Sequence, residues 1–158
     1  MFGLFNKATI TDSVLGELRY SKGRWRGLIE IAGASIPLAI AGIIKAPDES
    51  AIEAARKLPV TFAAFRPQIE FALFEHYELY AEAIASGELA PSQEGPIEIH
   101  SPAEVWRCVA PQFVSLEPMM GKLVAELGLA VYWDEEHTLG ARLDETGFFE
   151  LCGSVVPS

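Results

Sequence analysis

The amino-terminal third of the chain alternates apolar and polar residues as β-strands do. Over residues 17–20, Leu18 and Tyr20 alternate with charged residues, which is the two-residue period of a strand with one buried face. Turn-forming residues at 21–24 and 32–34 separate this segment from two further apolar runs, at 25–31 and 35–43. The pattern predicts a three-stranded antiparallel meander over residues 14–43.

The apolar period then changes to that of helices. Proline and acidic residues at 47–49, followed by Ser50-x-x-Glu53, are typical of a helix start. We expect Pro59 to end or kink this first helix, because proline lacks the N–H that a helix interior uses. A second, long amphipathic helix is predicted from Pro67 to Ser86–Gly87. The apolar stripe recurs every three or four residues: Phe62, Phe65, Ile69, Leu73, Tyr77, Tyr80 and Ile84.

The carboxy-terminal third returns to strand patterns. After a loop at 87–96 and a short strand at 97–100, Ser101-Pro102-Ala103-Glu104 predicts a brief helix. Strands are expected at 113–116, 123–133, 139–143 and 148–151, with Gly128 marking a bulge and residues 134–137 forming a tight connection. This order predicts an α+β fold, with two antiparallel β-meanders flanking a central helical segment that contains one long amphipathic helix.

The length of 158 residues corresponds to one domain, which we assign to residues 1–158. Residues 1–12 are expected to form a poorly ordered N-terminal extension. The longest uncharged stretch, residues 31–44, is shorter than the roughly 20 apolar residues of a membrane-spanning helix. Two isolated cysteines, Cys108 and Cys152, and the lack of a convincing secretory signal favour a cytoplasmic protein.

Charge is distributed unevenly along the chain. The net charge is −10, yet residues 1–69 hold 9 basic and 6 acidic residues, whereas residues 70–158 hold 3 basic and 16 acidic residues. An acidic surface repels phosphate backbones and anionic lipids, so neither nucleic acid nor a membrane is expected as a partner. The second half of the chain instead favours a basic protein partner.

The chemistry-bearing residues concentrate in one segment, Trp133-Asp134-Glu135-Glu136-His137. Carboxylates and imidazoles bind divalent cations, and a carboxylate beside a histidine raises the histidine pKa. Consecutive residues at a strand end point in different directions, however, so these side chains do not readily converge on one ion. A charged turn, with Asp134 accepting local backbone hydrogen bonds and His137 packing on Trp133, is the simpler interpretation.

Catalytic motifs are missing elsewhere. The chain has no GxxxxGK[ST] loop, no GxGxxG, no HExxH, no GxSxG and no EF-hand loop. We therefore expect no cofactor and no metal, and favour a non-catalytic protein-binding module with an acidic docking face. The alternative is a metal-assisted enzyme that uses Asp134, Glu136 and His137. A third hypothesis is a subunit that self-associates, consistent with the mean hydropathy of +0.22.

Two groups of residues also carry a resemblance. The segment Trp133-Asp134-Glu135-Glu136-His137-Thr138-Leu139-Gly140, followed by Gly147-x-x-x-Glu150-Leu151-x-Gly153, resembles the W-D-x-E-H-x-L-G-like hairpin of small bacterial domains of unknown function. Those domains also open with a pattern like Leu15-Gly16-x-Leu18 and a tryptophan strand like that at Trp25. Related domains are grouped with immunity proteins of bacterial toxin systems, which act by binding. The resemblance implies a bacterial, immunity-like binding protein and no catalytic residue.

Overall fold

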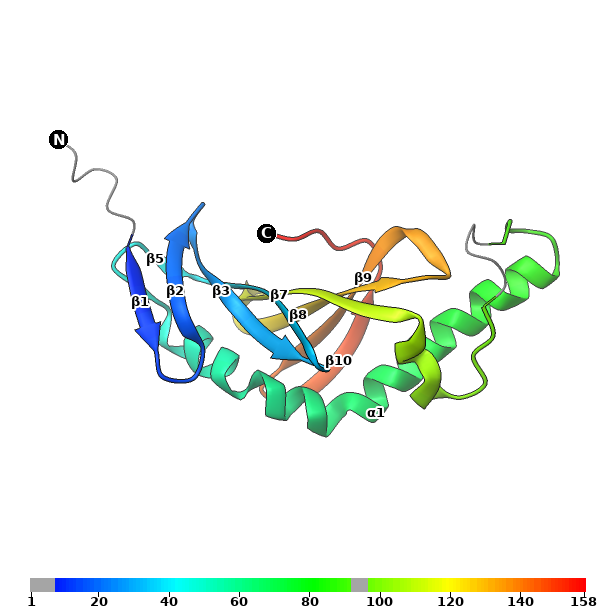
Figure 1. Ribbon diagram of the computed structural model, residues 1–158, viewed down its shortest axis with the longest axis horizontal. Helices are drawn as coiled ribbons and strands as arrows, with labels where there is room; N and C mark the ends of the chain where they lie inside the picture. Colours follow the sequence, from blue (N-terminus) through cyan, green and yellow to red (C-terminus); the bar gives the residue numbers. More distant parts are fainter. Residues whose placement is uncertain (1–7, 92–96) are drawn as a thin grey trace.

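The structure is a computed structural model that describes residues 8–91 and 97–158. Four strands come first, then two very short strands, a long helix, a short 3-10 helix and four more strands (Figure 1). Their bounds are β1 Thr9–Asp12, β2 Gly16–Ser21, β3 Arg24–Ile31, β4 Ala34–Ile40, β5 Gly42–Ile43, β6 Ala46–Pro47, α1 Glu49–Ala85, η2 Pro102–Arg107, β7 Val109–Met119, β8 Lys122–Val131, β9 Asp134–Asp144 and β10 Gly147–Cys152.

The two predicted meanders are confirmed, and they join into one sheet. The eight strands follow the order β1-β2-β3-β4-β7-β8-β9-β10. Neighbours are antiparallel except β4 and β7, which run parallel where Leu38–Ile40 pair with Val114–Leu116. A parallel pair needs a crossover connection, and α1 with η2 supplies it. The fold class is α+β, as predicted.

The first meander has four strands instead of the predicted three. Residues 9–12, which we assigned to the N-terminal extension, form β1 and pair with residues 16–19 of β2. Asp12 closes their turn because its Oδ2 accepts the backbone N–H groups of Val14 and Leu15, at 3.0 and 2.9 Å. Residues 1–7 of the expected extension lie outside the described residues.

The helical segment is one helix, so the prediction of two helices divided near Pro59 was wrong. α1 runs through both Pro59 and Pro67, which are exposed. It follows a curved path along the sheet (Figure 1), as expected where proline removes a helical hydrogen bond. Burial of its apolar stripe against the sheet outweighs the two missing bonds. Among the described residues, no helix combines the length and apolar character needed to cross a membrane.

The ends of α1 follow different rules. The helix begins at Glu49 after Asp48, and Ser50 lies within it, so the predicted capping box is not formed. At the other end the prediction is confirmed: Ser86 caps the helix and Gly87 takes a positive φ of 82°. The N–H of Glu88 then donates to the carbonyl of Ala83, which closes the last turn.

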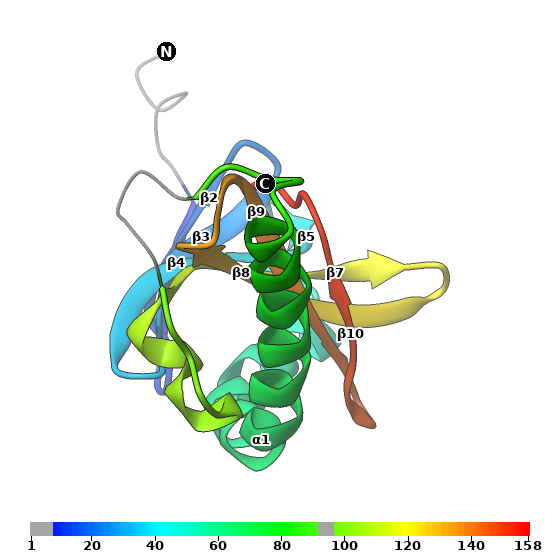
Figure 2. The same cartoon turned by 90° about the vertical axis from the view of Figure 1, so that its right-hand side faces the viewer.

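The core lies between α1 and the inner face of the sheet. In Figure 2 strands β3 and β4 lie to one side of α1 and β10 to the other, and α1 contacts β3, β4, β7, β8 and β10. Each strand contributes every second residue to the core, and the helix contributes every third or fourth. Fully buried members include Trp25, Leu38, Ile40, Ile69, Leu73, Leu116, Leu127, Leu129 and Leu139.

 The outer face of the sheet is packed differently from the inner face. Phe113 lies over Gly128, and a Cβ on that glycine would come within 2.2 Å of the phenyl ring. The register shift predicted at Gly128 belongs to its partner strand β7, between Pro111 and Phe113. The C-terminal residues cross the same face, where the N–H of Val155 donates to the carbonyl of Thr138. Gly128 therefore serves close packing of a neighbouring side chain.

The segment before β7 is less regular than expected. Residues 97–100 are not a strand, and the predicted brief helix is the 3-10 helix η2. Ser101 precedes η2 without a side-chain cap; Glu104 instead accepts the backbone N–H of His100 at 2.6 Å. Tyr77 of α1 holds this segment in place, because its hydroxyl donates to the carbonyl of Ile97 and accepts the N–H of Ile99.

Candidate functional site

The candidate residues 133–137 lie in the hairpin between β8 and β9, at the end of the sheet nearest the C-terminal half of α1 (Figure 1). The turn is at Tyr132–Trp133, where Val131 pairs with Asp134, and not at 134–137 as predicted. The next pair is Ala130 with Thr138, so residues 135–137 form a bulge in β9. The bulge arises because three residues of β9 are accommodated between two adjacent residues of β8.

Trp133 attaches this hairpin to α1. Its side chain is 6% exposed, and its indole N–H donates to Nδ1 of His76 at 2.8 Å. The indole also meets the ring of Tyr77 edge-on, with centroids 5.5 Å apart. The sequence predicts His137 against Trp133, but the structure places His76 in that position.

Asp134 is the centre of a second hydrogen-bonded group. Its Oδ2 accepts the hydroxyl of Tyr80 at 2.7 Å, and both carboxylate oxygens lie 3.0 Å from Nδ1 of His137. Because a carboxylate accepts, His137 carries a proton on Nδ1. Asp134, the first residue of β9, is buried, whereas His137 is exposed. The bulge at residues 135–137 allows His137 to contact Asp134 within the same strand.

The ionisation of these groups follows from their partners. Burial of Asp134 disfavours its charge, but hydrogen bonds from Tyr80 and His137 outweigh burial and lower the pKa of the carboxyl. The same hydrogen bond, with burial, raises the pKa of Tyr80 to about 12. Burial is the main cause that lowers the pKa of His76, against the opposing effect of Asp134. At neutral pH the group is therefore Tyr80–OH, Asp134 carboxylate and neutral His76.

This arrangement does not support the metal-assisted alternative. Asp134 and His137 are bonded to one another, and Glu136 is exposed. No cluster of three or more histidine, cysteine or acidic side chains in residues 8–91 and 97–158 has the geometry to hold a metal ion. A divalent cation needs several converging donors, and here the Asp134 carboxylate and His137 Nδ1 are bonded to each other.

Nucleophilic catalysis has no better support. Within the described residues the partner of His137 Nδ1 is the Asp134 carboxylate, and no hydroxyl or thiol is hydrogen-bonded to this histidine. Cys108 and Cys152 are both free thiols. Burial raises the pKa of each, with the nearby arginine opposing it, so neither is an activated thiolate at neutral pH.

Acidic side chains surround the attached hairpin. The sequence contains no lysine or arginine between Arg66 and Arg107, or between Lys122 and Arg142. The Tyr80–Asp134 and His76–Trp133 bonds bring these two cation-free stretches together. We call the result the acidic end, defined by the exposed residues Glu75, Glu78, Glu82, Glu135 and Glu136.

Comparison with known proteins identifies the family. The profile of a domain of unknown function, DUF6985, matches residues 14–151. The chain belongs to the DUF6985 family. The DUF6985 match begins in the turn between β1 and β2 and ends in β10, so it contains the hairpin, α1 and the sheet from β2 onward, and leaves out β1. No curated protein and no solved structure matches the chain.

The expected membership in a domain family of unknown function is thus confirmed, whereas the relation to immunity proteins stays a prediction. Of the five predicted site residues, the structure bonds Trp133 and Asp134 to α1 and His137 to Asp134, and it leaves Glu135 and Glu136 exposed on the bulge. Sequence reasoning missed Tyr80 and His76. Their only signal was the four-residue spacing, which places both on one face of the helix.

Proposed function

We propose that this protein is a non-catalytic, immunity-like binding module whose acidic end docks a basic partner protein. The observation that carries the proposal is the attachment of the cation-free hairpin to the cation-free half of α1. Two stretches of like charge repel one another, and the Tyr80–Asp134 and Trp133–His76 hydrogen bonds oppose this repulsion. A surface with charge of one sign speeds association with a partner of opposite charge and disfavours wrong partners.

Exposed apolar side chains support binding over mere solubility. Leu79 is 66% exposed and lies one helical turn from Glu75 and Glu82, and Tyr132 at the hairpin turn is 45% exposed. Protein interfaces combine such apolar or aromatic anchors with a charged rim, whereas a surface that serves only solubility does not need them. The partner we propose is therefore basic with apolar positions among its charges.

The test compares charge-neutralised baits in pull-downs from the native host at low salt. The bait Glu78→Gln/Glu136→Gln removes two charges from the acidic end; the control Glu49→Gln/Glu145→Gln removes two exposed charges elsewhere. Asp134 is left intact, because it is buried and holds the hairpin. We expect a basic protein to be retained by the native and control baits and lost from the first variant.

Ionic strength provides the second readout. Raising salt from about 10 mM to 150 mM shortens the Debye length from roughly 30 to 8 Å, so retention should fall steeply. Equal retention by the two variants, or retention that salt does not change, would refute an electrostatic docking face. A bait that retains only further copies of itself would instead establish the self-associating subunit.

A further inference from the structure

Within residues 8–91 and 97–158, no strand lies beside the second half of β3 on its β2 side. β2 pairs with β3 only from Arg19↔Arg26 to Ser21↔Arg24. Beyond this point the β1–β2 hairpin diverges, and among the described residues Leu28–Ile31 pair with β4 alone. The sheet therefore has an unpaired edge on β3, a strand that lies inside the sheet order and not at either end of it.

The register shows which backbone groups face that edge. The two-residue turn at Ala32–Gly33 is closed by Ile31 and Ala34, and the pair that closes such a turn is hydrogen-bonded. Along an antiparallel ladder, hydrogen-bonded and non-hydrogen-bonded pairs alternate, so Ile31 and Ile29 direct their N–H and C=O groups to β4. Leu28 and Glu30 direct theirs to the open side. Four backbone groups thus stand in position for another strand.

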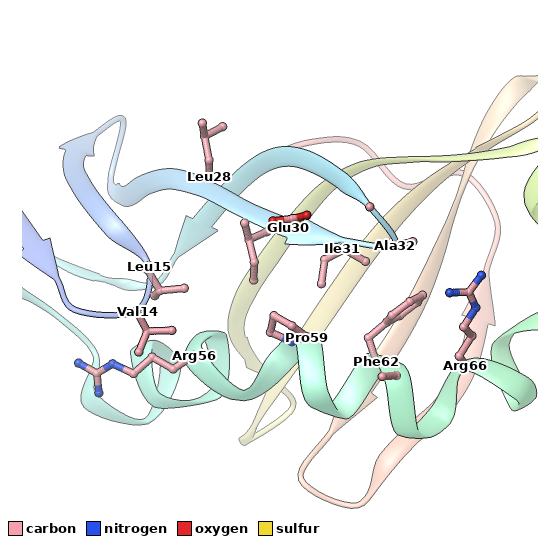
Figure 3. A pocket seen from close by; sticks show the side chains of 13 residues that line it. Val14, Leu15, Leu28, Glu30, Ile31, Ala32, Arg56, Pro59, Phe62 and Arg66 are labelled. Atoms are coloured by element: carbon pink, nitrogen blue, oxygen red, sulfur yellow. The ribbon is translucent and has the colours of Figure 1, made fainter.

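A groove of about 490 Å³ runs along this edge (Figure 3). Six consecutive residues, 28–33, line it. A groove over a sheet face would meet alternate residues, so consecutive lining residues mean that it follows the edge. Phe62 and Pro59 of α1 form the opposite side, and the β1–β2 turn closes one end with Val14 and Leu15.

The other edge of the same hairpin is protected. Leu28 pairs directly with Pro37 on β4. The pairing of β4 with β7 begins only at Leu38, so Pro37 lies on the unpaired part of that edge. Pro37 has no N–H to offer, and proline on an edge strand prevents addition of another chain. Of the two edges of the β3–β4 hairpin, only the β3 edge retains its full set of donors and acceptors.

Charge at the groove indicates the chemistry of its occupant. Arg56 and Arg66 stand on α1 at either side of Phe62, and Glu30 is the only acidic residue among those that line the groove (Figure 3). Both arginines remain partly exposed although Arg56 bonds to Asp12 and Glu53, and Arg66 to Glu70. The lining therefore favours an apolar segment with acidic flanking residues.

We propose that the Leu28–Ile31 edge of β3 binds an extended, acidic-flanked apolar segment of a partner protein by strand addition. Main-chain hydrogen bonds to Leu28 and Glu30 hold the segment, and its alternate side chains enter the groove beside Phe62. A single strand reaches this edge between α1 and the β1–β2 turn more readily than the sheet of a second copy does. This surface is separate from the acidic end and prefers the opposite charge.

The experiment selects from a library of displayed random nine-residue peptides with the immobilised full chain. Affinities of selected peptides are then measured for Leu28→Pro and Glu30→Pro, which each remove one outward N–H and leave the β4 pairing intact. The matched controls, Leu28→Ala and Glu30→Ala, change the same side chains and keep the N–H. Backbone amide spectra of the labelled protein locate the binding.

We expect the selected peptides to carry apolar residues at alternate positions, flanked by acidic residues. Their binding should shift the backbone amide resonances of residues 28–31. Each proline variant should weaken binding at least tenfold, and each alanine variant less than threefold. Should a proline variant unfold, N-methylation of alternate peptide residues removes the same hydrogen bonds from the other partner. Binding should persist in Glu78→Gln/Glu136→Gln, which separates this surface from the acidic end.

Three results would overturn the proposal. One is the absence of any peptide enriched above the bare support. Another is equal affinity for the proline and alanine variants, or for the N-methylated and unmodified peptides. The third is a native dimer that Leu28→Pro dissociates, because the occupant of the edge would then be a second copy of this chain.

Discussion

The Tyr80–Asp134 hydrogen bond gives the sharpest test of how the hairpin is held. Tyr80→Phe removes only the hydroxyl that lies 2.7 Å from the buried carboxylate. The ring and its stacking on His76, with centroids 5.0 Å apart, are retained. The substitution therefore isolates one hydrogen bond between α1 and β9.

The expected loss follows from the charge of the acceptor. A hydrogen bond to an ionised group contributes about 1.5–3 kcal/mol, because its removal leaves a poorly solvated charge. Asp134 is 9% exposed, but His137 remains bonded to both of its oxygens. We therefore expect the lower part of that range, about 1.5–2 kcal/mol. For a chain of this length the melting temperature should fall by roughly 3–8 °C.

Urea unfolding at pH 7, followed by tryptophan fluorescence, measures this loss. Tyr132→Phe is the matched control, since that ring lies in the same hairpin and is 45% exposed; we expect a change within about 0.5 kcal/mol. In an Asp134→Asn background, Tyr80→Phe should cost less, because the charged acceptor is gone. Equal effects of Tyr80→Phe and Tyr132→Phe would refute the claim that this bond holds the hairpin.

Two further predictions concern pH and packing. Because the pKa of His76 is lowered in the folded state, the unfolded chain binds more protons, so the stability that this group contributes is fully present above about pH 6.5 and is lost as the pH falls below it. Urea unfolding at pH 7 and 5 should show a shallower decline for His76→Gln than for the native chain, and equal declines would contradict this account. Gly128→Ala places a Cβ against the Phe113 ring and should cost about 1–3 kcal/mol of unfolding free energy. Gly140→Ala meets chiefly a side chain of the C-terminal segment and should cost less; similar losses in urea unfolding would contradict this account.

Apart from β1, the strands of both meanders were predictable because one buried face imposes a two-residue period on each. The joining of the meanders was not, since the parallel pair at Leu38–Ile40 depends on contacts far apart in the sequence. The division of α1 was predicted wrongly for a related reason. Local propensity penalises Pro59 and Pro67, and only the folded chain shows that burial of the apolar stripe keeps the helix continuous through both.

The candidate site was predicted in composition and not in geometry. The pattern of Trp133–His137 indicated a charged hairpin, and the structure contains one. Its anchors on α1 could not be predicted, because His76 and Tyr80 precede the hairpin by more than 50 residues. A histidine among glutamates, such as His76, is typical of a solvated helix face. Only the position of Trp133 in the structure shows that His76 accepts its indole N–H.

The continuity of α1 decides how the two proposed surfaces relate. The groove uses Arg56–Arg66 and the acidic end uses Glu75–Glu82, so the single helix carries both. From Arg56 to Glu78 the rise of an α-helix amounts to roughly 33 Å, the length of about ten residues of extended chain. A break at Pro67 would have left this separation undefined. Because the helix continues, a partner that engages both surfaces must present its basic patch and its acidic-flanked strand at that fixed spacing.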